Sequence, residues 1–257
     1  MRNVVLVLLA LAACRTPTPT PTPIPSPTPI PTPIATPTPT PTRANPVSPR
    51  FVEITAAGIP YTFRACEQLL VAVTRGNATA LGERLAPGDV LVAQGAGELS
   101  VKGTGFAVVA TVQPSVCEPN NATTLTKSVV RGSTAPELTW AGGKMHAHLD
   151  VGQDVSPNAY LGRLNGTAPV SEHTHPDSWE IICAVEAAGT FTLDGKEERL
   201  LQGQIIAVPP GAKHAWKPDT GKELVAIQMY APPGPEQRFR VLAAAAHDGG
   251  AGEGGKK

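Results

Sequence analysis

The sequence has 257 residues with 21 basic and 21 acidic side chains, so its formal net charge at pH 7 is zero. This balance argues against nucleic-acid binding and against a polybasic membrane module. Proline accounts for 28 residues, and fourteen of these lie between Pro17 and Pro49. Outside this segment and the extreme N-terminus about 200 residues remain, enough for one large or two small domains.

The first thirteen residues are typical of an export signal. A short positive start precedes an uninterrupted apolar run at residues 4–13. Such a run is too short to span a bilayer but has the length of a signal-peptide core. It ends in Leu-Ala-Ala-Cys at residues 11–14, which resembles the lipobox of bacterial lipoproteins. The resemblance implies cleavage before Cys14, a lipid on that cysteine, and a lipid-anchored location in the bacterial cell envelope. The alternative is an ordinary secretory signal with an incidental cysteine.

Residues 14–49 are predicted to be a Thr/Pro-rich linker. Thr-Pro and Ile-Pro pairs alternate almost without interruption between residues 16 and 42. Proline at every second position removes backbone donors and fixes φ, so neither helix nor sheet can form there. An extended polyproline II segment of this length would reach about 80 Å. The segment is either a stalk that holds a domain away from a lipid surface or a disordered linker.

The remaining chain contains one pattern twice. The two copies are related by an offset of 113 residues at first and of 115 residues further along. The matched pairs are Glu67 with Glu180, Gly76 with Gly189, Gly82 with Gly195 and Gly88 with Gly203. The segments between these positions are short, rich in β-branched residues and divided by Gly and Pro, which is typical of strands joined by tight turns. The sequence therefore predicts an all-β fold, with a helix considered only at residues 236–247 and a disordered tail at residues 248–257.

The second copy carries side chains suited to a metal ion, namely His173, His175, Glu180 and His214. Two histidines two positions apart on a strand point to the same side. The turn-forming pair Pro176-Asp177 could return Glu180 beside them through a hairpin, and His214 would come from a neighbouring strand. Three imidazoles and one carboxylate suit one divalent transition metal, which could be Fe, Mn, Ni, Cu or Zn.

The spacing of these residues resembles the two motifs of the cupin superfamily. The first motif reads Gly166, six residues, His-Thr-His, four residues, Glu180, eight residues and Gly189. The second reads Gly203, five residues, Pro-Pro-Gly, two residues and His214, with Pro218 in place of the family's asparagine. That asparagine is not a metal ligand in the family. The resemblance covers residues 135–240 and implies a jelly-roll-like double-stranded β-helix barrel with the metal near one mouth.

The repeat and the resemblance together predict two cupin-type barrels behind a disordered Pro-rich stalk. Residues 131–247 would form the metal-binding barrel. Residues 50–130 would form a degenerate barrel without a metal site, because only Glu67 of the ligand set recurs there. We expect Glu67 to be a hydrogen-bonded remnant. The alternative is a single C-terminal cupin preceded by an unrelated β-rich half.

Other side chains near the motifs are candidates for binding a substrate. Trp216 lies two positions after His214, so it shares that side of a strand. Gln228 and Tyr230 on the last strand are weaker candidates. For each of these three, packing in the core is the alternative. The loop residues Asp177 and Glu172 are the only candidates for a separate general base near the motif.

The remaining histidines and cysteines have structural interpretations. Alternation places His146, His148 and Asp150 on one face of a strand, which is either solvated or lines the mouth of the barrel. Because export permits disulfides, Cys66 and Cys117 form a candidate bridge within the first half. Cys183 lies in an apolar strand, where a small buried thiol is usual.

Three classes of function are compatible with these features. The first is a metal-dependent enzyme, since the resemblance implies oxygenase, isomerase or lyase chemistry with the metal as Lewis acid or O₂ platform. The second is a tethered module that binds a small molecule without catalysis, and the third is a structural envelope protein. The partners we expect are a small-molecule ligand, a membrane reached through Cys14, a second copy of the chain and no nucleic acid.

Overall fold

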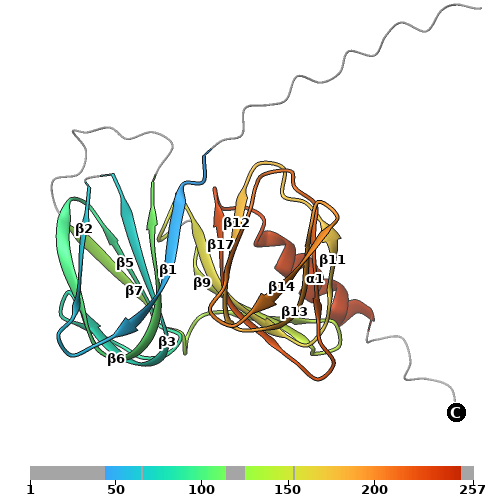
Figure 1. Cartoon of the computed structure of the whole chain (residues 1–257), viewed down its shortest axis with the longest axis horizontal. Coiled ribbons are helices and arrows are strands. Elements are labelled where there is room, and N and C mark those ends of the chain that lie inside the picture. Colours follow the sequence, from blue (N-terminus) through green and yellow to red (C-terminus); the bar gives the residue numbers. More distant parts are fainter. Residues whose placement is uncertain (1–43, 65, 114–124, 153, 250–257) are drawn as a thin grey trace, which may run out of the picture. The chain divides into compact units, whose positions relative to one another are not determined.

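The structure, a computed structural model, describes residues 44–64, 66–113, 125–152 and 154–249 (Figure 1). The predicted signal, Cys14, the linker up to residue 43, Cys117 and the end of the tail lie outside the described residues. Within the described part, no helix combines the length and the apolar character that a bilayer crossing requires.

The first barrel contains one sheet of seven strands, and every pair in it is antiparallel. The strand order is β1-β6-β3-β5-β7, with β2 on β6 and β4 on β3. The strands are β1 (Val47–Ile54), β2 (Ile59–Phe63), β3 (Gln68–Ala80), β4 (Glu83–Leu85), β5 (Val90–Gln94), β6 (Gly97–Val112) and β7 (Thr126–Val130).

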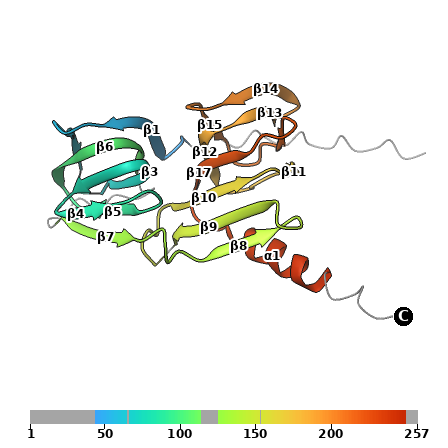
Figure 2. The ribbon, with the colours of Figure 1, turned by 90° about the horizontal axis from the view of Figure 1, so that it is seen from below.

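The second barrel contains two sheets and the one helix of the described residues. One sheet has the order β15-β12-β17-β10-β9-β8, part of which can be followed in Figure 2, and the other β11-β16-β13-β14. The helix α1 follows the last strand and packs against β8. The elements are β8 (Glu137–Trp140), β9 (Met145–Val151), β10 (Tyr160–Gly166), β11 (Val170–His173), β12 (Trp179–Glu186), β13 (Ala188–Leu193), β14 (Lys196–Leu201), β15 (Ile205–Val208), β16 (His214–Pro218), β17 (Leu224–Ala231) and α1 (Gln237–Gly249).

The sequence repeat reappears in the strand pairing. In the first barrel β3 pairs with β5 and with β6, as β12 pairs with β15 and β17 in the second. Likewise β1–β6 corresponds to β10–β17, and β2–β6 to β11–β16. The long strands β3 and β6 each match two shorter strands of the second barrel. The prediction of two related all-β barrels is confirmed, and the alternative of an unrelated first half is wrong.

The strand register corrects the position that matches Glu180. The amide of Gly88 donates to the carbonyl of Val73, and the amide of Gly203 donates to Ala184 in the same way, each at 2.8 Å. Val73 is therefore the counterpart of Ala184. Counting back four residues from each places Leu69, and not Glu67, at the position of Glu180.

Leu69 is fully buried, so the first barrel has an apolar side chain where the second has a carboxylate. Glu67 lies before β3 and accepts a hydrogen bond from the amide of Arg64 at 2.9 Å, so it is hydrogen-bonded as expected but is not a remnant of the metal ligand. The offset of 113 was wrong by two residues along this strand. A shift of two keeps every side chain on the same face, so the alternating pattern could not reveal the error.

The linker ends earlier than residue 49, because β1 already begins at Val47. Pro49 pairs with Ala110 of β6, although proline has no amide hydrogen to contribute. The strand tolerates it because β1 is at the edge of the sheet and pairs only with β6. At the other end, α1 continues to Gly249 and so enters the predicted tail.

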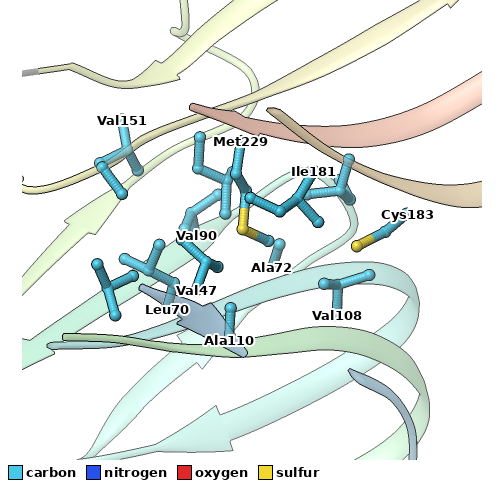
Figure 3. Close-up of a cluster of buried hydrophobic side chains, with 14 of the residues drawn as sticks. Val47, Leu70, Ala72, Val90, Val108, Ala110, Val151, Ile181, Cys183 and Met229 are labelled. Atoms are coloured by element: carbon cyan, nitrogen blue, oxygen red, sulfur yellow. The ribbon is translucent and has the colours of Figure 1, made fainter. Parts of the chain in front are cut away.

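Apolar side chains form three clusters, one inside each barrel and one shared by the two barrels. On β3, Leu69 belongs to the interior of the first barrel, whereas Leu70 belongs to the shared cluster. On β12, Ile182 belongs to the interior of the second barrel, whereas Ile181 belongs to the shared cluster. Figure 3 shows Leu70 and Ile181 within the shared cluster. Both faces of these strands are buried, which explains their continuous apolar runs.

The cysteines occupy two different environments. Cys66 is disulfide-bonded, but Cys117 lies outside the described residues, so this pairing stays a prediction. Cys183 is a free, fully buried thiol of the shared cluster, as expected for an apolar strand. Burial raises the pKa of Cys183 to about 12.

A buried carboxylate, Asp89, ties the start of β5 to the segment that leads into the second barrel. It accepts hydrogen bonds from the amides of Ala86 and Gly132 at 3.0 Å and from the guanidinium of Arg131 at 2.8 Å. Arg163 of β10 in turn donates to the carbonyl of Gly132 at 3.0 Å. Burial opposes ionisation of Asp89, but these donors outweigh it and hold its pKa below the ordinary value.

Asp89→Asn is expected to lower the free energy of unfolding at pH 7 by about 1–3 kcal/mol, because the charged acceptor of three donors is lost. Since the folded protein depresses the pKa, the stabilisation is present at neutral pH and disappears as the pH falls through that value. Urea unfolding at pH 7 and near pH 3 measures the difference. A penalty that is equally large at both pH values would contradict this account.

Candidate metal centre

Strand pairing brings His173 and His214 together. His173 is the last residue of β11, and it lies opposite His214, the first residue of β16. Their ring centroids are 4.1 Å apart. Two imidazoles from neighbouring strands therefore meet where β11 ends and β16 begins.

A loop between the two sheets, and not the expected hairpin, places His175 and Glu180 beside the other two residues. His175 lies in the loop after β11, and this loop passes from one sheet of the barrel to the other before β12 begins. The carbonyl of His175 accepts a hydrogen bond from the amide of Gly211 at 2.9 Å. Gly211 has a φ of 80°, which favours glycine, so the Pro-Pro-Gly turn holds the loop beside the start of β16.

The four predicted side chains form one compact cluster. One ligand atom from each of His173, His175, Glu180 and His214 lies within 4.8 Å of the others. An oxygen of Glu180 is 3.1 Å from Nε2 of His175 and 2.6 Å from Nε2 of His214. Glu180 and His214 are each only 2% exposed, while His173 is half-buried and faces a cavity.

Backbone carbonyls orient two of the imidazoles. Nδ1 of His173 lies 2.8 Å from the carbonyl of Ser171, and Nδ1 of His214 lies 3.0 Å from the carbonyl of Ala212. A ring that donates from Nδ1 presents the lone pair of Nε2 in the opposite direction, which is the arrangement that metal-binding histidines need. Both Nε2 atoms are thus available to one central ion.

Two further buried side chains hold the carboxylate of Glu180. The amide nitrogen of Gln228 donates to Oε1, and the hydroxyl of Tyr230 donates to the same oxygen at 3.4 Å. The other oxygen, Oε2, faces the imidazoles. Gln228 and Tyr230, predicted as substrate candidates, thus hold Glu180 in place, and both also line the cavity beside the cluster.

The electrostatic balance of the cluster keeps the carboxylate ionised. Burial opposes ionisation of Glu180, but hydrogen bonds and charges from His175 and His214 outweigh it, so its pKa is well below the usual range. Burial is also the main influence that lowers the pKa of His173 to about 4, helped by the charges of His214 and Arg238. An anionic Glu180 and a neutral His173 are the forms that bind metals.

The residues present fit a divalent transition metal. Nε2 of His175, Nε2 of His214 and Oε2 of Glu180 are buried, and the only polar contacts found for them among the described residues are those between the carboxylate and the two imidazoles. Buried polar atoms that lack partners are costly, and a cation shared between them removes that cost. Three imidazole nitrogens and one carboxylate oxygen suit Fe, Mn, Ni, Cu or Zn rather than the all-oxygen sites of Mg²⁺ or Ca²⁺.

A cavity of about 230 Å³ adjoins the cluster, and His173, Glu180 and His214 line it. Its walls are mainly apolar and include Ile182, Trp216, Leu224 and residues of α1. Trp216 can lie there because Gly189 has no side chain: a Cβ at Gly189 would come within 2.4 Å of the indole.

The remaining candidates lie elsewhere. Glu172 is exposed and pairs with Lys213 at 3.8 Å, Asp177 is exposed, and neither lines the cavity. His146 contacts Glu137 of β8 at 2.8 Å, outside the metal cluster. Sequence reasoning missed the contribution of α1, whose Arg238 and Phe239 also line the cavity.

Gln228→Leu is expected to weaken metal affinity about 10–100-fold, because Oε1 of Glu180 loses its amide donor while every ligand remains. Competition with a chelator of known affinity measures the change. Gln202→Leu is a matched control, because Gln202 is exposed on the second barrel. Equal affinity in the wild type and Gln228→Leu would show that the amide has no role in positioning the ligand.

Comparisons with known proteins agree with the site and the fold. Residues 163–230 match the family model described as Cupin domain, and this stretch includes all four cluster residues. No curated protein sequence matches the chain.

Solved structures support the two-barrel architecture. One is a Bacillus subtilis oxalate decarboxylase studied for its Mn(II) centres, at 12% identity and a TM-score of 0.57, covering 83% of this chain and 80% of that one. Another is protein Ylba from E. coli, at 13% identity and a TM-score of 0.52, covering 72% of this chain and 83% of that one. At such identities the likeness concerns the fold alone. The second barrel therefore contains a cupin domain, and the two barrels together have the fold of these solved structures.

Proposed function

We propose that this protein is a cell-envelope lipoprotein that binds one divalent transition metal and acts on a small molecule, with oxygenase or isomerase chemistry. The ligands are His173, His175, Glu180 and His214. The observation that carries the proposal is the position of the cluster: three of the four residues line a cavity of about 230 Å³. A molecule in that cavity would lie directly beside the ion.

Each group around the cavity has a definite task in this proposal. A bound divalent metal would supply Lewis acidity or a site for O₂. Gln228 and Tyr230 hold Glu180, and the carbonyls beside His173 and His214 fix the imidazoles. The apolar walls, with Trp216 among them, exclude water from the space where the small molecule would lie.

The second candidate function is binding of a small molecule without turnover. The cavity lining itself favours it, because among the described residues the only carboxylate there is Glu180, which the metal would engage. A reaction at this site would therefore depend on the metal or on the substrate for proton transfer.

The enzyme proposal is tested by loading the full chain with Fe, Mn, Ni, Cu or Zn and following O₂ and substrate with phenols, thiols and keto acids. Metal-dependent turnover that His175→Ala abolishes would support it. Saturable binding with no consumption of any compound would favour the second candidate. A chain that takes up none of these metals would refute the enzyme proposal and any metal-dependent form of the second candidate.

Membrane attachment is a separate part of the proposal and rests on the residues around Cys14. We expect palmitate labelling of the chain expressed in a bacterium and its recovery with membranes, and Cys14→Ser should abolish both. Labelling that persists in Cys14→Ser would contradict the assignment.

A further inference from the structure

Helix α1 closes one side of the metal cavity. Phe239 is 6% exposed and stacks on Trp140 of β8, with ring centroids 5.4 Å apart and planes 18° from parallel. It also lies against Tyr230, with centroids 6.5 Å apart. These aromatic contacts fix the first turn of the helix against the barrel, and Figure 2 shows α1 beside β8.

The residue before Phe239 introduces a positive charge into this wall. Arg238 is half-buried and lines the cavity together with His173, Glu180 and His214. Within the described part of the chain, no hydrogen bond or ion pair engages its guanidinium, whereas Arg131, Arg163 and Arg199 all have carboxylate partners. A half-buried guanidinium has lost part of its hydration, so an unpaired one favours an anionic ligand.

The balance of charge in the cavity points the same way. The titratable groups that line it are His173, Glu180, His214, Tyr230 and Arg238. Neutral histidines bind a divalent ion, and Glu180 cancels only part of the ion's charge. A tyrosine hydroxyl is uncharged at pH 7, since its ordinary pKa is about 10. The loaded cavity is therefore positive at both the metal and the helix.

The walls limit the rest of the ligand. Trp140, Leu164, Val170 and Leu242 are among the apolar residues that face the cavity. A volume of about 230 Å³ admits a small organic molecule, since a water molecule occupies about 30 Å³ in the liquid. The apolar part of a ligand would replace water against these walls. A charged group on the same ligand would need an oppositely charged side chain or the metal ion beside it.

We propose that Arg238 binds the carboxylate of the substrate and that the substrate is a small carboxylic acid with an aromatic or branched apolar body. A guanidinium offers a carboxylate two parallel N–H donors, which fixes orientation as well as affinity. This inference deepens the proposed function and rests on it, since the second anchor of the ligand is the metal site.

The test uses the full chain loaded with zinc, which has no redox chemistry, and isothermal titration with benzoate and its neutral analogue benzamide. We expect benzoate to bind at least about 10-fold more tightly than benzamide. Arg238→Gln should weaken benzoate binding about 10–100-fold, because two charge-assisted donors are lost. Zinc content and benzamide binding should be unchanged in this variant.

Arg240→Gln is the matched control, because Arg240 is exposed on the same helix and lines a different cavity with Asp150 and Tyr160. It should bind benzoate like the wild type. The proposal would be overturned by equal benzoate affinity in the wild type and Arg238→Gln at equal zinc content, by benzamide binding as tightly as benzoate, or by no binding of benzoate.

Failure of the proposed function has a different signature, namely the absence of zinc uptake. In that event the same titrations with the metal-free chain still test Arg238. Benzoate binding that Arg238→Gln weakens would support the carboxylate assignment without the metal. No dependence on Arg238 would overturn it.

Discussion

Replacing His214 by alanine is expected to lower metal affinity more than about 100-fold. The effect should exceed that of Gln228→Leu, because His214 is itself a ligand and Gln228 only holds one. The variant loses one of four donors and leaves Oε2 of Glu180 without the imidazole that lies 2.6 Å away. After dialysis, its metal content should fall from about one equivalent to below about a tenth, because an ion held more than about 100-fold more weakly is lost to the buffer. Elemental analysis of the purified chain measures the metal content, and competition with a chelator of known affinity measures the change in affinity.

His146→Ala is the control for a general effect of removing a histidine. His146 lies on β9 and contacts Glu137, outside the cluster. Its metal content should match the wild type, and the circular dichroism of both variants should match as well. A His214→Ala protein that is folded and retains a full equivalent of metal would show that the metal is bound elsewhere.

Leu70→Ala is expected to lower the free energy of unfolding by about 2–5 kcal/mol, the usual cost of a cavity left by a buried leucine. Leu70 is fully buried in the cluster that both barrels share, and it lies on β3, away from the metal site. Because the second barrel supplies Ile181 and Met229 to that cluster, both barrels should lose stability together. Urea unfolding followed by circular dichroism and by tryptophan fluorescence measures the effect.

Val241→Ala provides the comparison, because Val241 is 69% exposed and its truncation should cost almost nothing. The tryptophans Trp140, Trp179 and Trp216 all lie on strands of the second barrel, so fluorescence reports on that barrel and, through Trp179, on the shared cluster. A Leu70→Ala transition that is unchanged by fluorescence but shifted by circular dichroism would mean that the barrels unfold independently.

The sequence predicted the elements whose patterns are local. Short β-branched strands and glycine turns, present twice, predicted a repeated all-β unit, and the resemblance to the cupin motifs implied two barrels. The spacing of His173, His175, Glu180 and His214 predicted a cluster that the structure forms. The strands, the turns and the spacing of the motif residues are all set by residues that are close to one another in the sequence. The all-β class and the repeat could therefore be derived from local patterns, and the barrel itself came from the family resemblance.

Features that depend on strand register or on distant contacts were wrong or missed. A shift of two residues has no effect on alternation, so Glu67 was matched with Glu180 where Leu69 belongs. The loop after β11 crosses between sheets, a choice that the turn pair Pro176-Asp177 does not encode. Arg238 follows the motifs at a distance and enters the cavity only because Phe239 packs on Trp140.

The most direct test of the central claim is the metal content of the wild-type chain after exposure to Fe, Mn, Ni, Cu and Zn in turn, followed by dialysis. The arrangement of His173, His175, Glu180 and His214 predicts about one equivalent of at least one of these metals, as four-ligand protein sites bind a single ion. Less than about a tenth of an equivalent of every metal, in a folded protein, would contradict the account, because such a site is expected to be filled.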